Sequence, residues 1–213
     1  MIRLAAVSFV ALAVGGFHAS VQPLSPPVRA ELTGEFWHRG CPVALSQLRV
    51  LAVSHWGFDG RAHTGRLVVN ADVAAPLARV FRRLYTLHFP IRHMRLADAY
   101  GPRRSRPTDT DVSDAFECRQ AVASPCSGAR KGTGSWSQHA YGHAVDLNPV
   151  ENPYVGCGMS RDPASRPYLD RSRLRLGMVT PAVVDAFRSN GWGWGGAWSG
   201  STKDYMHFSA SGH

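Results

Sequence analysis

A strand, a turn, a second strand and a helix follow one another closely, and this succession most constrains the fold. Residues 48–54 and 66–70 are rich in apolar, β-branched side chains, and the segment between them contains the favoured turn pair Asp59-Gly60. The pattern predicts two strands joined by a hairpin-like loop. Apolar residues then recur at helical spacing with arginines on the other side, which predicts an amphipathic helix over residues 74–87.

Strands and helices continue to alternate along the rest of the chain without a repeating strand–helix–strand unit. Further strands are expected at residues 91–97, 115–122 and 144–147, with an exposed polar loop at residues 101–114. Thr180-Pro181 predicts the start of a helix, because a hydroxyl N-cap precedes a proline at the first helical position. The absence of a repeating unit favours the α+β class.

Composition narrows the class of protein. The 213 residues are 44% hydrophobic and 18% charged, with 21 Gly and 14 Pro, which excludes a coiled coil, a collagen-like chain and a wholly disordered protein. No apolar run reaches the roughly 20 residues needed to cross a bilayer. The net charge of +9 favours anionic partners, such as nucleic acid or the carboxylates of a cell wall. No block of five like charges occurs, so a nucleic-acid patch is disfavoured.

The N-terminus has the features of an export signal. Arg3 precedes an apolar stretch over residues 4–17, and the small residues Ala19 and Ser20 follow it. We therefore expect a signal peptide over residues 1–19, a proline-containing lead-in over residues 20–39 and one domain over residues 40–213. A buried N-terminal helix is the alternative.

The cysteines agree with export. The chain has four, Cys41, Cys118, Cys126 and Cys157, and an even number in an exported chain predicts two disulfides. Three connectivities are possible, and the sequence leaves all of them open. Reduced, buried thiols are the alternative.

One stretch and one short motif carry the chemistry. His139 and Asp146 lie in residues 137–149, and His207 follows far downstream. Two imidazoles and a carboxylate can supply three zinc ligands and leave a fourth position for water, as in catalytic zinc sites. Asp204 precedes His207 by three residues and can act beside the metal as general base and acid. A loop histidine with a buried aspartate is the alternative that these residues leave open.

Two other zinc motifs are excluded by the spacing. His139 and His143 lie four residues apart, as in the helical H-E-x-x-H motif, but Ala140 replaces the glutamate and Gly142 disfavours a helix. Cys126 and the two histidines mimic part of a zinc finger, but the preceding cysteine is too distant and export disfavours a finger. His143 is therefore left out of the site.

The motif Ser-x-His-x-x-Gly-x-Ala-x-Asp over residues 137–146, followed by Asp-x-x-His over residues 204–207, resembles the zinc peptidases of the D-alanyl-D-alanine carboxypeptidase group, the M15 peptidases. The resemblance extends from about residue 40 to residue 208 and includes Phe116-Glu-Cys-Arg119. The group contains D-Ala-D-Ala carboxypeptidases and dipeptidases and L-alanyl-D-glutamate endopeptidases. The resemblance implies a single domain with a small central antiparallel sheet flanked by helices, like that of Hedgehog and the D-Ala-D-Ala peptidases.

The resemblance also implies roles for individual residues. His139, Asp146 and His207 match the three ligands of one zinc ion per chain, and Asp204 matches the catalytic acid and base. Arg119 matches the arginine that orients substrate and stabilises the oxyanion. A surface salt bridge is the alternative for Arg119.

Three features remain open within this interpretation. Ser137 either holds the loop geometry or contacts substrate. Trp192, Trp194 and Trp198 are expected in the core, with the wall of a peptide cleft as the alternative. Asp204 replaces the Glu of the vancomycin-type enzymes and resembles some endopeptidases of the group.

The sequence therefore predicts an exported zinc metallopeptidase, secreted or associated with the cell wall, that hydrolyses peptidoglycan stem peptides. We expect a monomer with no nucleic-acid partner and no transmembrane segment in the mature chain. The alternative is a non-catalytic, zinc-containing domain that binds the wall or a partner, as the Hedgehog domain illustrates. The bond cleaved, exo- or endopeptidase action, and whether the protein acts on its own wall or on another stay open.

Overall fold

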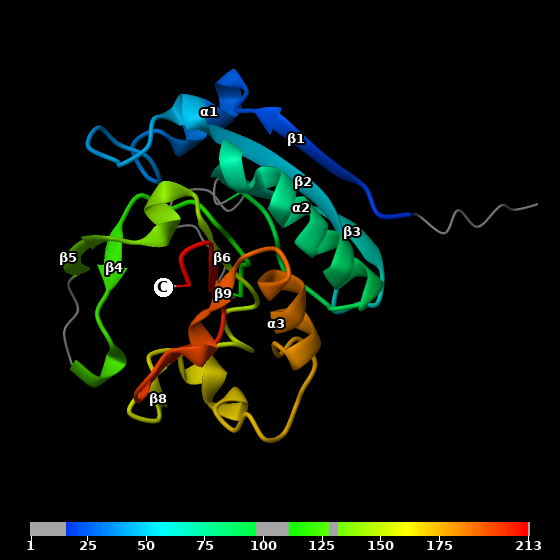
Figure 1. The fold of residues 1–213 in the computed structure, drawn as a ribbon, viewed down its shortest axis with the longest axis vertical. Helices are drawn as coiled ribbons and strands as arrows, with labels where there is room; N and C mark the ends of the chain where they lie inside the picture. Colours follow the sequence, from blue (N-terminus) through cyan, green and yellow to red (C-terminus); the bar gives the residue numbers. More distant parts are fainter. Residues whose placement is uncertain (1–15, 97–110, 128–131, 213) are drawn as a thin grey trace, which may run out of the picture.

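The computed structural model describes residues 16–96, 111–127 and 132–212 (Figure 1). One antiparallel sheet has the order β1-β2-β3 and contains the two longest strands of the described residues, β2 and β3. The strands are β1 (Ala19–Pro23), β2 (Leu48–Trp56) and β3 (Ala62–Asn70). Strands β2 and β3 pair from Leu48 opposite Asn70 to Trp56 opposite Ala62, so the predicted hairpin is confirmed. It is longer than expected, because a turn of only a few residues allows pairing to continue through His55 and His63.

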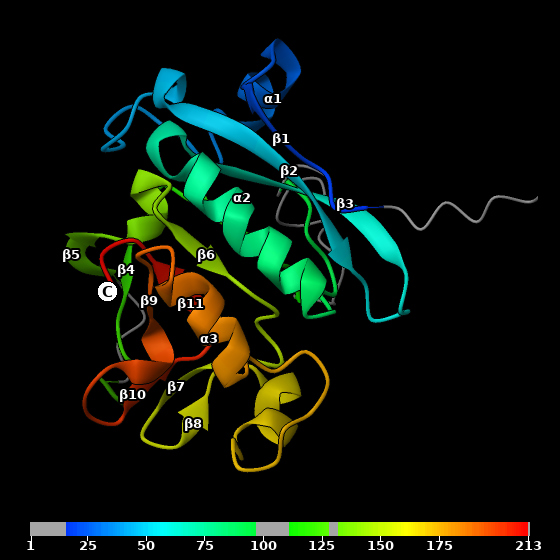
Figure 2. The same ribbon diagram turned by 45° about the vertical axis from the view of Figure 1, so that its right-hand side comes forward.

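Helix α2 (Ala71–Thr86) follows β3 directly and lies along the sheet, with α3 (Pro181–Arg188) beside it (Figures 1 and 2). The buried residues of α2 recur at the predicted helical spacing and are Val73, Ala74, Leu77, Val80, Phe81 and Leu84. Helix α3 begins at Pro181, as predicted. Its Phe187 stacks on Phe208 with ring centroids 3.8 Å apart, so the main core joins both helices to the C-terminal end of the chain.

The opposite face of the sheet is covered by the segment expected as a lead-in. Helix α1 (Pro26–Leu32) lies in this segment. Its apolar side chains and their neighbours form a second buried cluster with Leu24, Val28, Leu32, Phe36, Leu48, Val50 and Val68. Along β2, Val50 faces this cluster while Leu51 and Val53 face the main core, which is the two-residue period of a strand buried on both faces.

The C-terminal half contains small antiparallel sheets joined by 3₁₀ turns. One sheet has the order β6-β11-β9, with β6 (Ala144–Asp146), β11 (His207–Ser209) and β9 (Gly193–Trp194). Another has the order β10-β7-β8, with β10 (Thr202–Asp204), β7 (Tyr154–Gly156) and β8 (Met159–Ser160). A separate hairpin pairs β4 (Gln120–Val122) with β5 (Gly132–Trp136). The 3₁₀ turns are η1 (Leu45–Gln47), η4 (Pro125–Ser127), η5 (Gln138–Tyr141), η6 (Pro163–Tyr168) and η7 (Gly195–Ala197). This mixture confirms the α+β class.

Three expectations for the middle of the chain are corrected. In the described part of residues 91–97 the chain makes only isolated bridges and no continuous strand, and the strand expected over residues 115–122 is limited to β4. The polar loop expected at residues 101–114 lies largely outside the described residues. Its described end is not exposed, because Asp111 and Ser113 are buried and hydrogen-bonded to Arg92 and Asn148.

All four cysteines form disulfides, Cys41–Cys118 and Cys126–Cys157, which confirms two bridges and resolves the pairing that the sequence left open. The signal peptide expected at residues 1–19 lies largely outside the described residues. Among the helices that the structure describes, none combines the length and the apolar character that a bilayer span requires.

Candidate active site

The structure brings His139, Asp146 and His207 together. His139 lies in η5, Asp146 ends β6, and His207 begins β11 directly opposite Asp146 in the β6–β11 pair. His139 Nε2 lies 3.2 Å from His207 Nδ1 and 3.2 Å from Asp146 Oδ2, and His207 Nδ1 lies 3.2 Å from Asp146 Oδ1. All three residues are buried. Their nitrogen and oxygen atoms therefore converge on one point.

The local backbone explains why the motif places His139 there. The Ser137 hydroxyl caps η5 by accepting a hydrogen bond from the His139 amide. Gly142 then ends the turn with a φ of 69°, and a Cβ atom on it would lie 2.6 Å from the backbone nitrogen of Asn70. Only glycine suits this left-handed conformation and close approach. The turn thus packs against β3 and delivers the chain into β6.

The His139 imidazole is oriented as a metal ligand requires. His139 Nδ1 donates a hydrogen bond to the carbonyl of Ala115, which leaves Nε2 to face the other two residues. Burial lowers the pKa of His139, but the Asp146 carboxylate outweighs this and raises it to about 9. Two imidazole nitrogens and a carboxylate in such close contact can hold a cation among them. Two nitrogens and one oxygen are also the donor set of catalytic zinc sites, so these residues fit a zinc ion.

A second group of possible ligands, His38, Cys41 and Cys118, also converges. Both of its sulfur atoms belong to the Cys41–Cys118 disulfide, so it offers no thiolates. His143 lies apart from the converging ligands and pairs with Asp72 at 3.0 Å, in agreement with its omission from the site.

Asp204 ends β10 and lines the same cleft as the three converging residues. Its Oδ1 atom is buried and has no hydrogen-bond partner among the described residues. Burial raises the pKa of Asp204 well above its ordinary value, and the nearby Asp146 carboxylate adds to the rise. Gly195 allows this placement, since a Cβ atom there would lie 2.5 Å from the Asp204 carbonyl oxygen.

Arg119 lies on the wall of the cleft immediately before β4. Its Nε donates to Glu117 Oε2 at 2.7 Å. The surrounding backbone ties it to the histidine turn, because the Ser137 amide donates to the Arg119 carbonyl and the Glu117 amide donates to the His139 carbonyl. The Cys41–Cys118 disulfide fixes the adjacent residue. The salt bridge that was the alternative for Arg119 is therefore present, and the arginine also lines the cleft.

The cleft has a volume of about 470 Å³. It is lined by Arg119, Ala121, Val122, Trp136, Ser137, Gln138, His139, Asp146, Tyr154, Trp198, Asp204, Met206 and His207. Of the tryptophans singled out in the sequence, Trp198 lines the cleft, Trp192 is buried in the core and Trp194 packs against it.

Sequence reasoning did not single out Trp136, Tyr154 or Glu117 as site residues. Trp136 and Tyr154 are cleft residues, and Glu117 holds Arg119. Glu117 and Tyr154 lie within segments that carry the family resemblance, so their positions were visible in the sequence. Their roles depend on long-range contacts, which no local pattern reveals.

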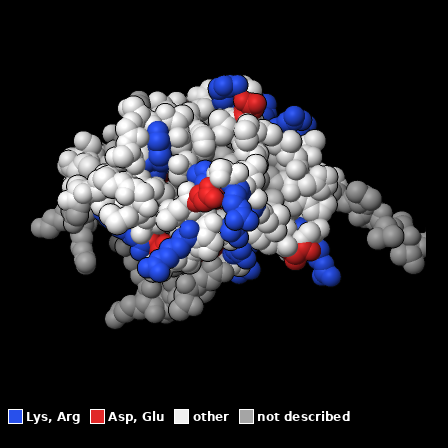
Figure 3. Space-filling model, turned by 90° about the horizontal axis from the view of Figure 1, so that it is seen from below, with Lys and Arg blue, Asp and Glu red and all other residues white. Residues whose placement is uncertain are grey.

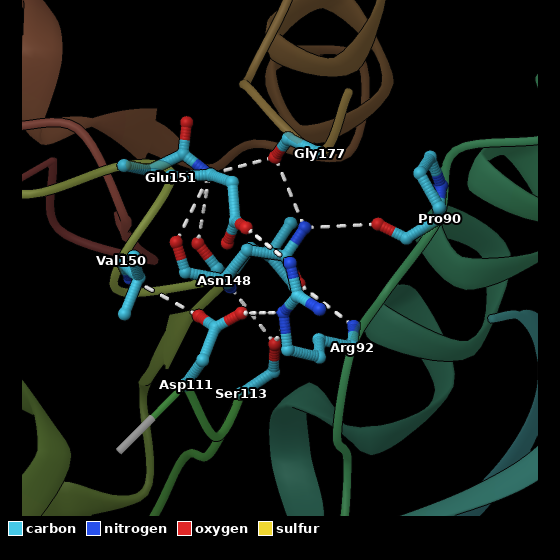
Figure 4. A network of polar contacts seen from close by, with 10 residues as sticks. Pro90, Arg92, Asp111, Ser113, Asn148, Val150, Glu151 and Gly177 are labelled. Carbon is cyan, nitrogen blue, oxygen red and sulfur yellow. Dashed lines mark hydrogen bonds and ion pairs between the residues drawn. The ribbon is translucent and has the colours of Figure 1, made fainter. Parts of the chain in front are cut away.

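A buried polar network is centred on residues that come shortly after Asp146 in the sequence (Figure 4). Asn148 follows Asp146 by two residues, and its side chain donates to the carbonyls of Pro90 and Gly177 and accepts from the Arg92 amide. The Arg92 guanidinium donates to Asp111 at 2.6 Å and to Glu151 at 2.7 Å, as the dashed lines in Figure 4 show. The network therefore anchors the chain just beyond the end of β6.

Comparison with protein families gives a match over the C-terminal part of the chain. Residues 131–210 match a family model described as D-alanyl-D-alanine carboxypeptidase. The matched segment contains His139, Asp146, Asp204 and His207, whereas Arg119 precedes it. No curated protein and no solved structure matches the chain.

Proposed function

We propose that the chain is an M15 peptidase, because residues 131–210 match the family model described as D-alanyl-D-alanine carboxypeptidase, and that it is an exported, zinc-dependent enzyme that hydrolyses the stem peptides of peptidoglycan. The observation that carries the proposal is the convergence of His139, Asp146 and His207 beside the unpartnered carboxylate oxygen of Asp204. We also propose that the domain shares the scaffold of Hedgehog and the D-Ala-D-Ala peptidases.

Each residue has a task in this mechanism. His139, Asp146 and His207 would hold the zinc ion, which when bound supplies Lewis-acid activation of a water molecule and of the scissile carbonyl. Asp204 would accept a proton from the attacking water and return it to the leaving amine. Its raised pKa suits this exchange, because a carboxyl group works best in both directions when its pKa approaches the working pH.

Arg119 would stabilise the negative charge that develops on the carbonyl oxygen. Glu117 keeps its guanidinium at the cleft wall through the bond to Nε. A guanidinium held in place needs little rearrangement when the charge develops, which is the source of the electrostatic benefit.

Surface charge and disulfides support the proposed location. More Lys and Arg than Asp and Glu side chains are visible on the face in Figure 3, and such a surface favours an anionic wall. The pairing of all four cysteines suits the oxidising environment outside the cytoplasm.

The test is cleavage of defined stem peptides, read by mass spectrometry, with and without a chelator. We expect a chelator-sensitive cut and a bound zinc ion. Asp204→Asn should keep the zinc and lose turnover by a factor of about 100 to 10,000, because it removes the base but none of the ligands. Full activity in that variant would refute the assigned mechanism. Zinc binding without cleavage by the unaltered protein would favour the non-catalytic binding domain.

A further inference from the structure

The first strand of the sheet begins inside the segment that the sequence predicted to be an export signal. The signal was expected over residues 1–19, but β1 already starts at Ala19. Figures 1 and 2 show β1 at the edge of the sheet, beside β2. Every residue of β1 pairs with β2, from Ala19 opposite Val53 to Pro23 opposite Arg49. Removal of residues 1–19 would therefore cut into the folded domain.

The residues just before β1 are also anchored to the domain. The Phe17 ring packs against the main core and meets the Tyr85 ring at a centroid distance of 5.8 Å. The Arg82 guanidinium carbon lies 5.5 Å from the centroid of the same ring. The His18 amide donates to the Ser54 hydroxyl at 3.0 Å, and the Ser54 amide donates to the His18 carbonyl at 2.9 Å. Phe17 and His18 are therefore part of the fold.

These anchors matter because β1 has little burial of its own. All five of its residues are exposed, so the strand itself contributes little apolar burial. Backbone pairing holds it along its length, Phe17 holds it at its start, and Leu24, directly after its end, is buried in the second cluster. The net stability from hydrogen bonds at an exposed edge is modest, since water competes for the same groups. Loss of Phe17 would therefore leave the start of β1 without its apolar anchor.

The sequence offers a cleavage site that spares this anchor. A signal peptide ends in small residues directly before the cut. The pair Gly15-Gly16 meets this requirement immediately before Phe17. A cut after Ala19 would instead have the large side chains of Phe17 and His18 directly upstream of Ala19. The fold and the cleavage pattern therefore favour the same bond.

We infer that the export signal is removed at the Gly16–Phe17 bond, so that the mature protein begins at Phe17 and keeps β1. The reaction is a hydrolysis by the signal peptidase of the secretion machinery, in which water adds across the bond and leaves a carboxylate on Gly16 and an ammonium group on Phe17. Gly16 is exposed, so the new ammonium group lies beside solvent and its charge stays hydrated. The inference rests on the proposed export and moves the expected end of the signal from residue 19 to residue 16.

The experiment secretes the full-length chain from a bacterial host and identifies the first residue of the exported protein by mass spectrometry. We expect Phe17. Gly16→Leu places a large side chain directly before the cut and should abolish cleavage at this bond. The folded domain has room for that side chain, since no atom lies within 4 Å of a Cβ atom on Gly16. Ala19→Leu makes a similar change at an exposed residue of β1 and should leave the first residue unchanged.

A second measurement tests the anchor without export. Chains produced from Phe17 and from Ser20 are compared by urea denaturation, and the chain from Ser20 should have a midpoint lower by about 0.5 M or more. Phe17→Ala in the longer chain should also lower the midpoint. Val21→Ala changes an exposed residue of β1 and should have a much smaller effect.

The outcomes separate the inference from the function on which it rests. An exported protein that begins at Ser20, or one that keeps residues 1–16, would overturn the inference and leave the peptidase untouched, since none of the described residues that line the cleft precedes Arg119. Equal urea midpoints for the two chains would also overturn it. Failure of export would overturn the proposed location and the inference together. An exported protein that begins at Phe17 but cleaves no stem peptide would overturn the peptidase function alone.

Discussion

Glu151→Gln should remove a pH-dependent loss of stability from this protein. Glu151 and Asp111 are both buried, they share one cation, Arg92, and Glu151 Oε2 has no hydrogen-bond partner among the described residues. Burial, together with the neighbouring Asp111 carboxylate, raises the pKa of Glu151 from 4.5 to about 7, although Arg92 opposes the rise. The folded protein therefore holds this proton more tightly than the unfolded chain does.

The sign and size of the change in the free energy of unfolding follow from the difference between the Glu151 pKa in the folded and unfolded states. Because the folded state binds the proton more tightly, the free energy of unfolding falls as the pH rises from about 4.5 through about 7. One pKa unit corresponds to about 1.4 kcal/mol, so Glu151 alone lowers the stability by up to about 3 kcal/mol across this range. A glutamine can accept from Arg92 and donate to Asp111 as the protonated glutamate does, and it carries no charge at any pH.

Urea denaturation of the zinc-loaded protein at pH 5 and at pH 8 measures the effect. We expect Glu151→Gln to match the unaltered protein at pH 5 and to be more stable by up to about 3 kcal/mol at pH 8. Glu31→Gln, which removes an exposed carboxylate in α1, serves as the matched control and should follow the unaltered protein at both pH values. If the difference between Glu151→Gln and the unaltered protein were the same at both pH values, the reasoning about this carboxyl pair would be refuted.

Further substitutions test the metal ligands, a disulfide and the core. His139→Ala should abolish stoichiometric zinc in metal analysis while circular dichroism remains that of a folded chain, and retention of a full zinc ion would contradict its role as a ligand. Replacing Cys126 and Cys157 together by serine should lower the free energy of unfolding by about 3–4 kcal/mol, because the bridge spans 31 residues; an unchanged urea midpoint would argue against this bridge. Phe187→Ala should cost about 3–5 kcal/mol by the same assay, since the ring is fully buried against Phe208; a cost below about 1 kcal/mol would contradict the packing described.

Local sequence patterns predicted the strands and the helix in which apolar residues recur with the period of that element. The hairpin of β2 and β3 and the buried face of α2 follow from residue periodicity, because each side chain is buried by its own strand or helix position. The segment beginning at Ile91 was wrongly expected to be a strand. Its backbone amides donate to partners far along the chain, including the Trp56 carbonyl and the Asn148 side chain. No local pattern reveals such partners.

The candidate site also contains residues that the sequence predicted and residues that it did not. The motif spacing and the family resemblance pointed to His139, Asp146 and His207 as a set, and the structure brings them together. Asp111 was expected in an exposed loop because it is polar. It is buried, and its carboxylate accepts a hydrogen bond from Arg92. The place of Tyr154 in the cleft could not be predicted, because it arises from the pairing of β7 with β10, which sets Tyr154 opposite Asp204.

The register of β11 has a consequence for the whole domain. His207 and Phe208 are consecutive, so they point to opposite sides of the strand, His207 toward Asp146 and Phe208 into the core against Phe187. A slip of one residue would exchange the two, turning the imidazole into the core and the phenyl ring toward the ligands. Burial of the Phe208 ring and placement of the His207 imidazole beside Asp146 therefore require the same register of β11 against β6. Substitutions in the core beneath β11 should consequently change metal affinity, and removal of the metal should loosen the core.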